Sequence, residues 1–101
     1  MRLTFFLFLF ISNLAYADYD KDMAALRKDM PKIVIKFINR QTECNHWGGE
    51  EPYDKERLQE IKAAVDKLKC VNLEKDEKLL KKQHKSNPKV FSSINKAKAL
   101  Y

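Results

Sequence analysis

Side chains with reactive or metal-binding groups are concentrated in one short stretch of this 101-residue chain, from Cys44 to Asp54. The stretch reads Cys-Asn-His-Trp-Gly-Gly-Glu-Glu-Pro-Tyr-Asp. An imidazole and nearby carboxylates supply nitrogen and oxygen ligands, so His46 with Glu50, Glu51 or Asp54 is a candidate metal site. A structural zinc site needs four well-placed ligands, whereas this stretch contains one histidine. A small metal-binding protein centred on His46 is therefore the alternative function, and no cofactor is expected.

Two catalytic arrangements are conceivable in the same stretch. In the first, Cys44 is a nucleophile and His46 is its general base. Residues two apart on a helix point away from each other, and a disulfide to the second cysteine, Cys70, would remove the nucleophile. In the second, Glu50 and Glu51 are paired carboxylates, but a small helical domain offers little cleft for a sugar chain. The sequence therefore predicts a protein that is not an enzyme.

A structural role accounts for the same residues one by one. Gly48–Gly49 favour the end of a helix, because glycine tolerates the left-handed conformation that closes helices. Glu50–Glu51 suit the positive end of the next helix, and Pro52 suits its first turn. Asp54 is the competing N-cap of that helix. His46 falls in the last turn before the glycines, where it can bond free carbonyl groups.

Two aromatic residues, Trp47 and Tyr53, flank this turn. In the structural interpretation they cover the corner that the disulfide makes. In the competing hypothesis they are the anchors of a partner-binding surface, because aromatic and arginine side chains carry much of the binding energy at interfaces. Arg57 and His46 complete this candidate surface.

The run from Cys44 to Asp54 resembles the motif C-x-H-[WF]-x-G-E-x-P-Y-D of small exported proteobacterial proteins. In that group the motif is followed by an Arg-bearing helix, a second cysteine and a basic C-terminal stretch. Arg57, Cys70 and the lysine-rich tail occupy the corresponding places here, so the resemblance covers roughly residues 30–89. It implies export to the periplasm and a homologous fold, and it implies no particular reaction.

The first 17 residues, Met1–Ala17, have the three parts of a secretory signal peptide. Arg2 precedes an apolar run, and Ala15-Tyr16-Ala17 forms a small-residue cleavage site. We expect cleavage after Ala17, a mature chain of residues 18–101, and a periplasmic or secreted location. No later segment approaches the roughly 20 apolar residues of a transmembrane helix, so none is expected after cleavage.

The fold class follows from composition and cysteine count. Only two glycines and three prolines are present, which is too few turn residues for a β-sandwich. Two cysteines in an exported chain predict one disulfide, Cys44–Cys70. The sequence therefore predicts a single all-α domain, a small three- to four-helix bundle pinned by that disulfide.

Apolar spacing places the expected helices. Residues 18–30, with Met23, Leu26 and Met30 at helical spacing, form either a short helix or a loose arm, and Pro31 starts the next element. Its inner face holds Ile33, Val34, Phe37, Ile38, Gln41 and Cys44. The following helix has a narrow seam of Leu58, Ile61, Val65 and Leu68. Asn72 is the expected cap of a helix over residues 73–85. Asn87-Pro88 begins a last helix that carries Val90, Phe91, Ile94 and Ala97.

The positive charge is confined to the last third of the chain. Residues 69–101 hold nine lysines against three acidic residues, whereas residues 18–68 are nearly neutral. The candidate basic patch consists of Lys78, Lys81, Lys82, Lys85 and Lys89. It favours an anionic envelope component or an acidic protein as partner.

Helix electrostatics is the alternative explanation of this patch, because Glu74/Lys78 and Glu77/Lys81 are spaced as i,i+4 pairs. Lysines without interleaved aromatic residues argue against nucleic acid. His84 is expected to be exposed. The resulting hypothesis is an exported non-enzymatic accessory or interaction protein of the bacterial envelope, of unspecified oligomeric state.

Overall fold

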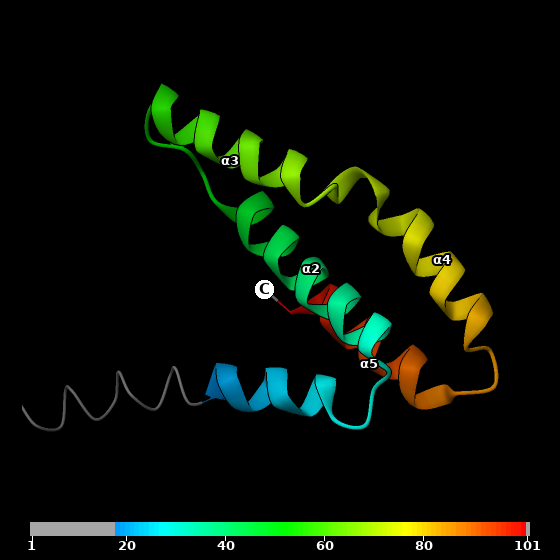
Figure 1. Ribbon diagram of the computed structural model, residues 1–101. Coiled ribbons are helices and arrows are strands. Elements are labelled where there is room, and N and C mark those ends of the chain that lie inside the picture. The colour runs from blue at the N-terminus through cyan, green and yellow to red at the C-terminus, as the bar shows by residue number, and fades with distance from the viewer. Residues whose placement is uncertain (1–17, 101) are drawn as a thin grey trace, which may run out of the picture.

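The computed structural model describes residues 18–100, so the predicted signal peptide lies outside the described residues. The described chain consists of a helix over residues 18–27, α2 (Lys32–Gly49), α3 (Lys55–Lys67), α4 (Leu73–Gln83) and α5 (Pro88–Ala99), with a 3₁₀ turn, η1 (Cys70–Asn72), before α4. Figure 1 shows α3, η1 and α4 forming an arch above α2 and α5, with the first helix below. The all-α prediction is confirmed. The predicted number of three to four helices is too low, because residues 18–27 are helical and pack on the core.

The core lies around α2, which contacts α3, α4 and, most extensively, α5. The buried cluster draws side chains from four helices: Met23, Leu26, Val34, Phe37, Ile38, Leu80, Val90, Ile94 and Ala97. Each large aliphatic side chain buried in this way contributes roughly 1.5–3 kcal/mol relative to full exposure. Met23 and Leu26 are 5 % exposed, so the first helix packs on this cluster through these two side chains.

The buried face of α2 is shifted relative to its apolar pattern, because Thr42 is buried at one edge and Ile33 is exposed at the other. Val34, Phe37, Ile38, Gln41 and Cys44 are buried as predicted. Ile33, which was placed on the same face, is 55 % exposed. At 100° per residue it falls at the edge of the apolar arc, on the side that faces α4.

The turn between α2 and α3 differs from the prediction in its caps. Gly49 is the last residue of α2, yet no glycine among the described residues has a positive φ. Glu50 ends the helix in an extended conformation instead. Pro52 precedes α3 rather than occupying its first turn, because Asp54 is the N-cap and its Oδ1 accepts a hydrogen bond from the Arg57 N–H at 2.7 Å.

The helix α3 contributes little to the hydrophobic core. Of its predicted seam only Ile61 is buried, whereas Leu58, Val65 and Leu68 are half-buried. Ile61 also lies outside the main buried cluster. Polar contacts and the disulfide must therefore supply much of what holds α3 on α2.

The last two helices follow the sequence signals closely. Asn87 caps α5, its side chain accepts a hydrogen bond from the Val90 N–H, and Pro88 is the first helical residue as predicted. Asn72 precedes α4 as predicted but makes no capping hydrogen bond with its side chain. α4 ends at Gln83, two residues earlier than expected, because His84 leaves the helical conformation.

Candidate functional site

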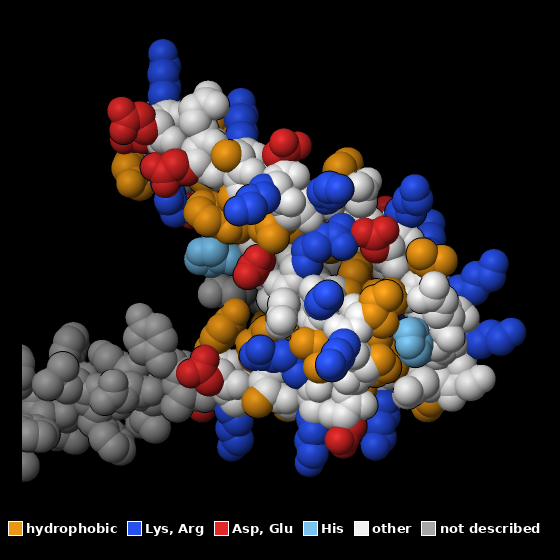
Figure 2. Space-filling view, viewed as in Figure 1, with side chains coloured by type: hydrophobic (Ala, Val, Ile, Leu, Met, Phe, Trp, Pro, Cys, Tyr) orange, Lys and Arg blue, Asp and Glu red, His pale blue; other side chains and the backbone are white. Residues whose placement is uncertain are grey.

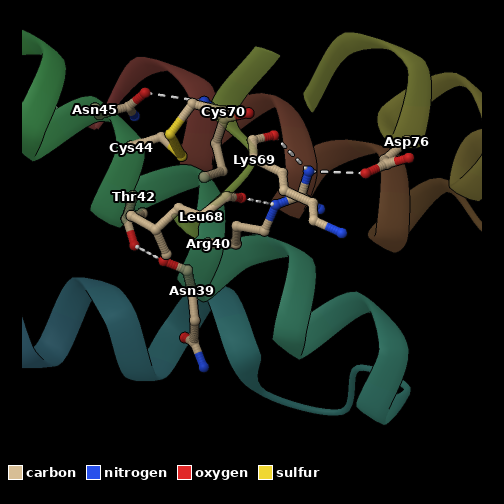
Figure 3. Close-up of a disulfide and its surroundings, with 10 residues drawn as sticks. Asn39, Arg40, Thr42, Cys44, Asn45, Leu68, Lys69, Cys70 and Asp76 are labelled. Carbon is tan, nitrogen blue, oxygen red and sulfur yellow. Dashed lines mark hydrogen bonds and ion pairs between the residues drawn. A yellow bond between two sulfur atoms is a disulfide. The ribbon is translucent and has the colours of Figure 1, made fainter. Parts of the chain in front are cut away.

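The predicted disulfide is present between Cys44 and Cys70, whose Cα atoms are 5.8 Å apart. It joins the C-terminal half of α2 to η1, immediately after α3 (Figure 3). The bond fixes one end of α3 against α2. It also occupies the Cys44 sulfur, so Cys44 cannot act as a thiolate nucleophile in this state.

Arg40 of α2 secures the same end of α3 by a contact that the sequence did not reveal. Its Nε donates a hydrogen bond to the Leu68 carbonyl at 2.7 Å, and its guanidinium also donates to the Lys69 carbonyl at 3.0 Å. A further bond reaches Asp76 of α4 at 2.8 Å (Figure 3). Carbonyls at a helix C-terminus lack helical partners and carry partial negative charge, so a guanidinium there satisfies both needs. Arg40 thus links α2, α3 and α4.

Arg57 secures the opposite end of α3. Its Nε and one terminal nitrogen donate to the two carboxylate oxygens of Glu50 at 2.6 and 2.7 Å, and the other terminal nitrogen donates to Glu60 at 2.8 Å. The guanidinium carbon lies 5.1 Å from the centre of the Trp47 ring, a cation–π geometry. Hydrogen bonding from Arg57 lowers the pKa of Glu50. The hydrogen bonds that Arg57 makes to Glu50 and Glu60 raise its own pKa.

The linker between α2 and α3 is therefore closed on itself. Glu50 at its start binds the Arg57 side chain, and Asp54 at its end binds the Arg57 backbone N–H. Between them Tyr53 is 82 % exposed. It projects from the linker and covers little of the corner, contrary to the structural interpretation of this residue.

The structure brings together three of the four candidate partner-binding residues. Trp47 is half-buried beside Arg57, and His46 packs edge-on against Trp47 with ring centres 5.9 Å apart. Tyr53 stands apart from these contacts on the linker. We call the set His46, Trp47, Tyr53 and Arg57 the α2–α3 corner.

The described residues contain no group of three or more His, Cys, Asp or Glu side chains arranged to hold a metal ion. Of the candidate ligands around His46, Glu50 is bound to Arg57 through both oxygens, and Glu51 is exposed. The carboxylates with shifted pKa values, Glu50 and Glu77, are both stabilised in the charged form by ion pairs. Neither has the raised pKa of a general acid.

The candidate basic patch divides into structural and exposed lysines. The predicted i,i+4 pairs are present, with Lys78 3.7 Å from Glu74 and Lys81 2.8 Å from Glu77. Lys81 also donates to Asn95 of α5 at 2.7 Å, so it serves helix packing. The others in the patch, Lys78, Lys82, Lys85 and Lys89, are exposed.

Glu77 is a buried carboxylate, which its i,i+4 spacing to Lys81 does not by itself indicate. It is 8 % exposed, and Lys81 of α4 and Lys98 of α5 both contact its oxygens. Burial opposes its ionisation, but the two lysines outweigh that effect and lower its pKa. His84, which was expected to be exposed, is half-buried with Nδ1 2.9 Å from the Leu80 carbonyl, because it ends α4.

Asn45 caps a second helix from α2. Its Nδ2 donates to the carbonyls of Ala97 and Leu100, each at 2.9 Å, and its Oδ1 accepts from Gln41 at 2.9 Å. Asn45 therefore supplies hydrogen-bond donors to the backbone carbonyl groups at the end of α5, as Arg40 does at the end of α3. In the sequence, the only indication of this role was that Asn45 is a polar residue next to the buried face of α2.

Comparison of the chain with protein-family models, curated proteins and solved structures gives no significant match. Among residues 18–100, no helix combines the length and the apolar character needed to cross a membrane.

Proposed function

We propose that this chain is an exported, non-enzymatic accessory or interaction protein of the bacterial envelope that binds its partner through the α2–α3 corner. Export is supported by the signal-like segment Met1–Ala17 and by the disulfide, since disulfides persist in oxidising compartments. The resemblance of residues 44–54 to the motif of exported proteobacterial proteins favours the periplasm.

One observation carries the choice of surface: a largely exposed tyrosine stands on a linker that is tied at both ends. Tyr53 is 82 % exposed, and Arg57 binds Glu50 on one side of it and Asp54 on the other. An anchoring aromatic on a pre-ordered turn loses little conformational entropy on binding, which favours affinity. Tyrosine is also among the residues enriched at binding hot spots.

The other three residues of the corner hold the linker in place and extend the binding surface beyond Tyr53. Arg57 holds the linker, Trp47 stacks beneath the guanidinium, and exposed His46 extends the surface toward α2. The exposed lysines of the basic patch provide long-range attraction to an acidic envelope protein or an anionic envelope component. They steer the encounter, whereas the corner supplies selectivity.

The test is affinity capture of envelope proteins on immobilised residues 18–101, followed by measurement of the dissociation constant for the captured partner. Tyr53→Ala is expected to weaken binding by about 2 kcal/mol, or roughly thirtyfold. The matched control is Val71→Ala, because Val71 is 90 % exposed and lies outside the corner. Binding that survives Tyr53→Ala and Trp47→Ala but disappears at high salt would overturn the proposal and assign recognition to the lysines.

A further inference from the structure

An apolar groove runs between α2 and α4, away from the α2–α3 corner. Its floor is made by Phe37 and Leu80, which are buried, and its walls by Ile33 and Leu79, which are each 55 % exposed. The groove has a volume of about 280 Å³. The groove therefore places two exposed aliphatic side chains beside a buried apolar floor.

The groove has the length of a short helical contact. The Arg40–Asp76 ion pair closes one end, and Ile33 and Gln83 line the other. From Ile33 to Arg40 the wall spans seven residues of α2, which is about 10 Å, or two helical turns. A volume of this size suits a few inserted side chains rather than a larger small-molecule ligand.

Apart from one ion pair, the charged side chains beside the groove that we consider here are unpaired lysines. Arg40 and Asp76 neutralise each other at the closed end. Lys36 lines the α2 wall, and Lys75 and Lys82 lie one turn on either side of Leu79 on α4. These three lysines are exposed and form no ion pair within the described part of the chain. Basic side chains project from the α4 side of the molecule in Figure 2.

We propose that this α2–α4 groove binds an acidic amphipathic helix of a partner protein. The helix inserts apolar side chains at positions i, i+3 or i+4, and i+7 between Ile33 and Leu79, and its flanking Asp and Glu side chains face Lys36, Lys75 and Lys82. The groove favours a helix over a membrane surface because its apolar floor is recessed between two walls. The charge pattern favours an external acidic partner over an apolar one. The groove is separate from the corner, so this inference stands whether or not the corner binds.

The probe is a fluorescent, side-chain-stapled helical peptide with leucines at i, i+3, i+4 and i+7 and glutamates on both flanks. A second peptide carries lysines in place of the glutamates. We expect fluorescence anisotropy to show saturable binding of the acidic peptide to residues 18–101, at least about tenfold tighter than the basic one and weakened by salt.

The variants Leu79→Glu and Ile33→Glu are expected to weaken binding of the acidic peptide about tenfold or more. Their side chains are more than half exposed, so unchanged circular dichroism should accompany the loss. Val71→Glu is the matched control, because it places the same charge at an exposed apolar position outside the groove. Lys36→Glu should weaken the acidic peptide and improve the basic one, whereas Lys62→Glu on α3 should change neither.

Several results would overturn the inference. The first is binding of the acidic peptide that the basic peptide equals or that Leu79→Glu leaves unchanged. A second is absence of peptide binding together with Leu79-dependent binding to phosphatidylethanolamine–phosphatidylglycerol vesicles, which would assign the groove to a membrane surface. A third is absence of peptide binding together with self-association in sedimentation experiments that Leu79→Glu abolishes, which would assign it to a second copy of the chain.

Discussion

How strongly a polar side chain of α2 connects that helix to other elements depends on its position and not on its residue type alone. Arg40 makes three hydrogen bonds to other elements, yet its neighbour Lys36 on the same helix makes no ion pair within the described chain. The difference is geometric, because Arg40 lies within reach of the carbonyl groups at the C-terminal end of α3. Such a residue contributes by satisfying carbonyl groups that would otherwise lose their partners.

The first prediction concerns Arg40. Arg40→Met should lower the free energy of unfolding by about 2 kcal/mol, because it removes charge-assisted bonds to two carbonyls and to Asp76. Lys36→Met, one turn away and exposed, should change it by less than about 0.5 kcal/mol. Urea unfolding followed by circular dichroism measures both. Equal effects of the two changes would show that the Arg40 contacts add nothing.

The second prediction concerns the buried carboxylate of Glu77. Its pKa is lowered from an ordinary value near 4.5, so its ion pairs stabilise the folded state above that value and are lost as pH falls through the lowered pKa. At pH 7, Glu77→Gln should therefore cost about 1–2 kcal/mol, and at pH 3 the cost should be much smaller.

Unfolding free energies measured across this pH range test the Glu77 prediction. Glu74→Gln is the control, since Glu74 is exposed and lies 3.7 Å from its lysine. This variant should follow the wild-type pH dependence. A cost of Glu77→Gln that stays constant between pH 7 and pH 3 would contradict the assignment.

At the scale of elements, α3 is held mainly at its ends. Arg57 and Glu50 fix its start, and Arg40 and the disulfide fix its end, whereas only Ile61 is buried between them. The other helices instead share the main apolar cluster. This contrast predicts that the packing of α3 depends on its end contacts and the disulfide more than the packing of any other helix described here does.

The third prediction tests the turn that ends α3. Lys69 adopts a left-handed conformation with φ of 53°, which costs energy for any residue with a Cβ atom. Lys69→Gly should raise the free energy of unfolding by about 0.5–1 kcal/mol, because glycine adopts this conformation without the steric cost. The hydrogen bond from Arg40 is kept, since it goes to the backbone carbonyl of residue 69. Lys62→Gly, at an exposed position in the interior of α3, should lower it by about 1 kcal/mol. Thermal unfolding of the two variants should thus move in opposite directions.

The fourth prediction concerns the disulfide. The two cysteines are 26 residues apart, so the loop-entropy model assigns the bond about 3.5 kcal/mol of stability. In a Cys44→Ser/Cys70→Ser variant, amide hydrogen exchange should accelerate most in residues 55–68, since α3 has few other buried contacts. Amides of α2 and α5 facing the main cluster should be affected less. Uniform acceleration across all helices would rule out the view of α3 as a separately anchored element.

Local sequence signals predicted the elements better than they predicted the site. Asn87-Pro88 and the spacing of Val90, Ile94 and Ala97 located α5 correctly, because caps and apolar periodicity act within one helix. The role of Arg40 could not be found in this way, since its carbonyl partners lie 28 and 29 residues away and depend on how α3 packs against α2. The pairing of Trp47 with Arg57 spans a shorter separation, but it also depends on how the linker between α2 and α3 folds back.

On the scale of the whole molecule, the helices of residues 18–100 carry two separate exposed surfaces. The α2–α3 corner presents Tyr53 at one end, and the α2–α4 groove presents Ile33 and Leu79 along one side. Both surfaces share α2, but they use different residues. Variants of one surface are therefore suitable controls for the other.

The fifth prediction concerns the exported form. If Met1–Ala17 is a signal peptide, N-terminal sequencing of protein recovered from the periplasm should begin at Asp18. Intact mass without reduction should be two hydrogens below that of the dithiol form, because Cys44 and Cys70 are bonded. Recovery of the uncleaved chain in the membrane fraction, or labelling of both native thiols, would contradict the expected processing and location.

The double capping role of α2 has a consequence for sequence variation. Arg40 and Asn45 each satisfy backbone carbonyls of a different helix, and backbone groups remain whatever residues those helices carry. The outer positions of α3 and α5 are therefore free to drift, while Arg40 and Asn45 are not. A saturation-mutagenesis library selected for folding should show tolerance on the outward faces of α3 and α5, with its strictest polar constraints on α2.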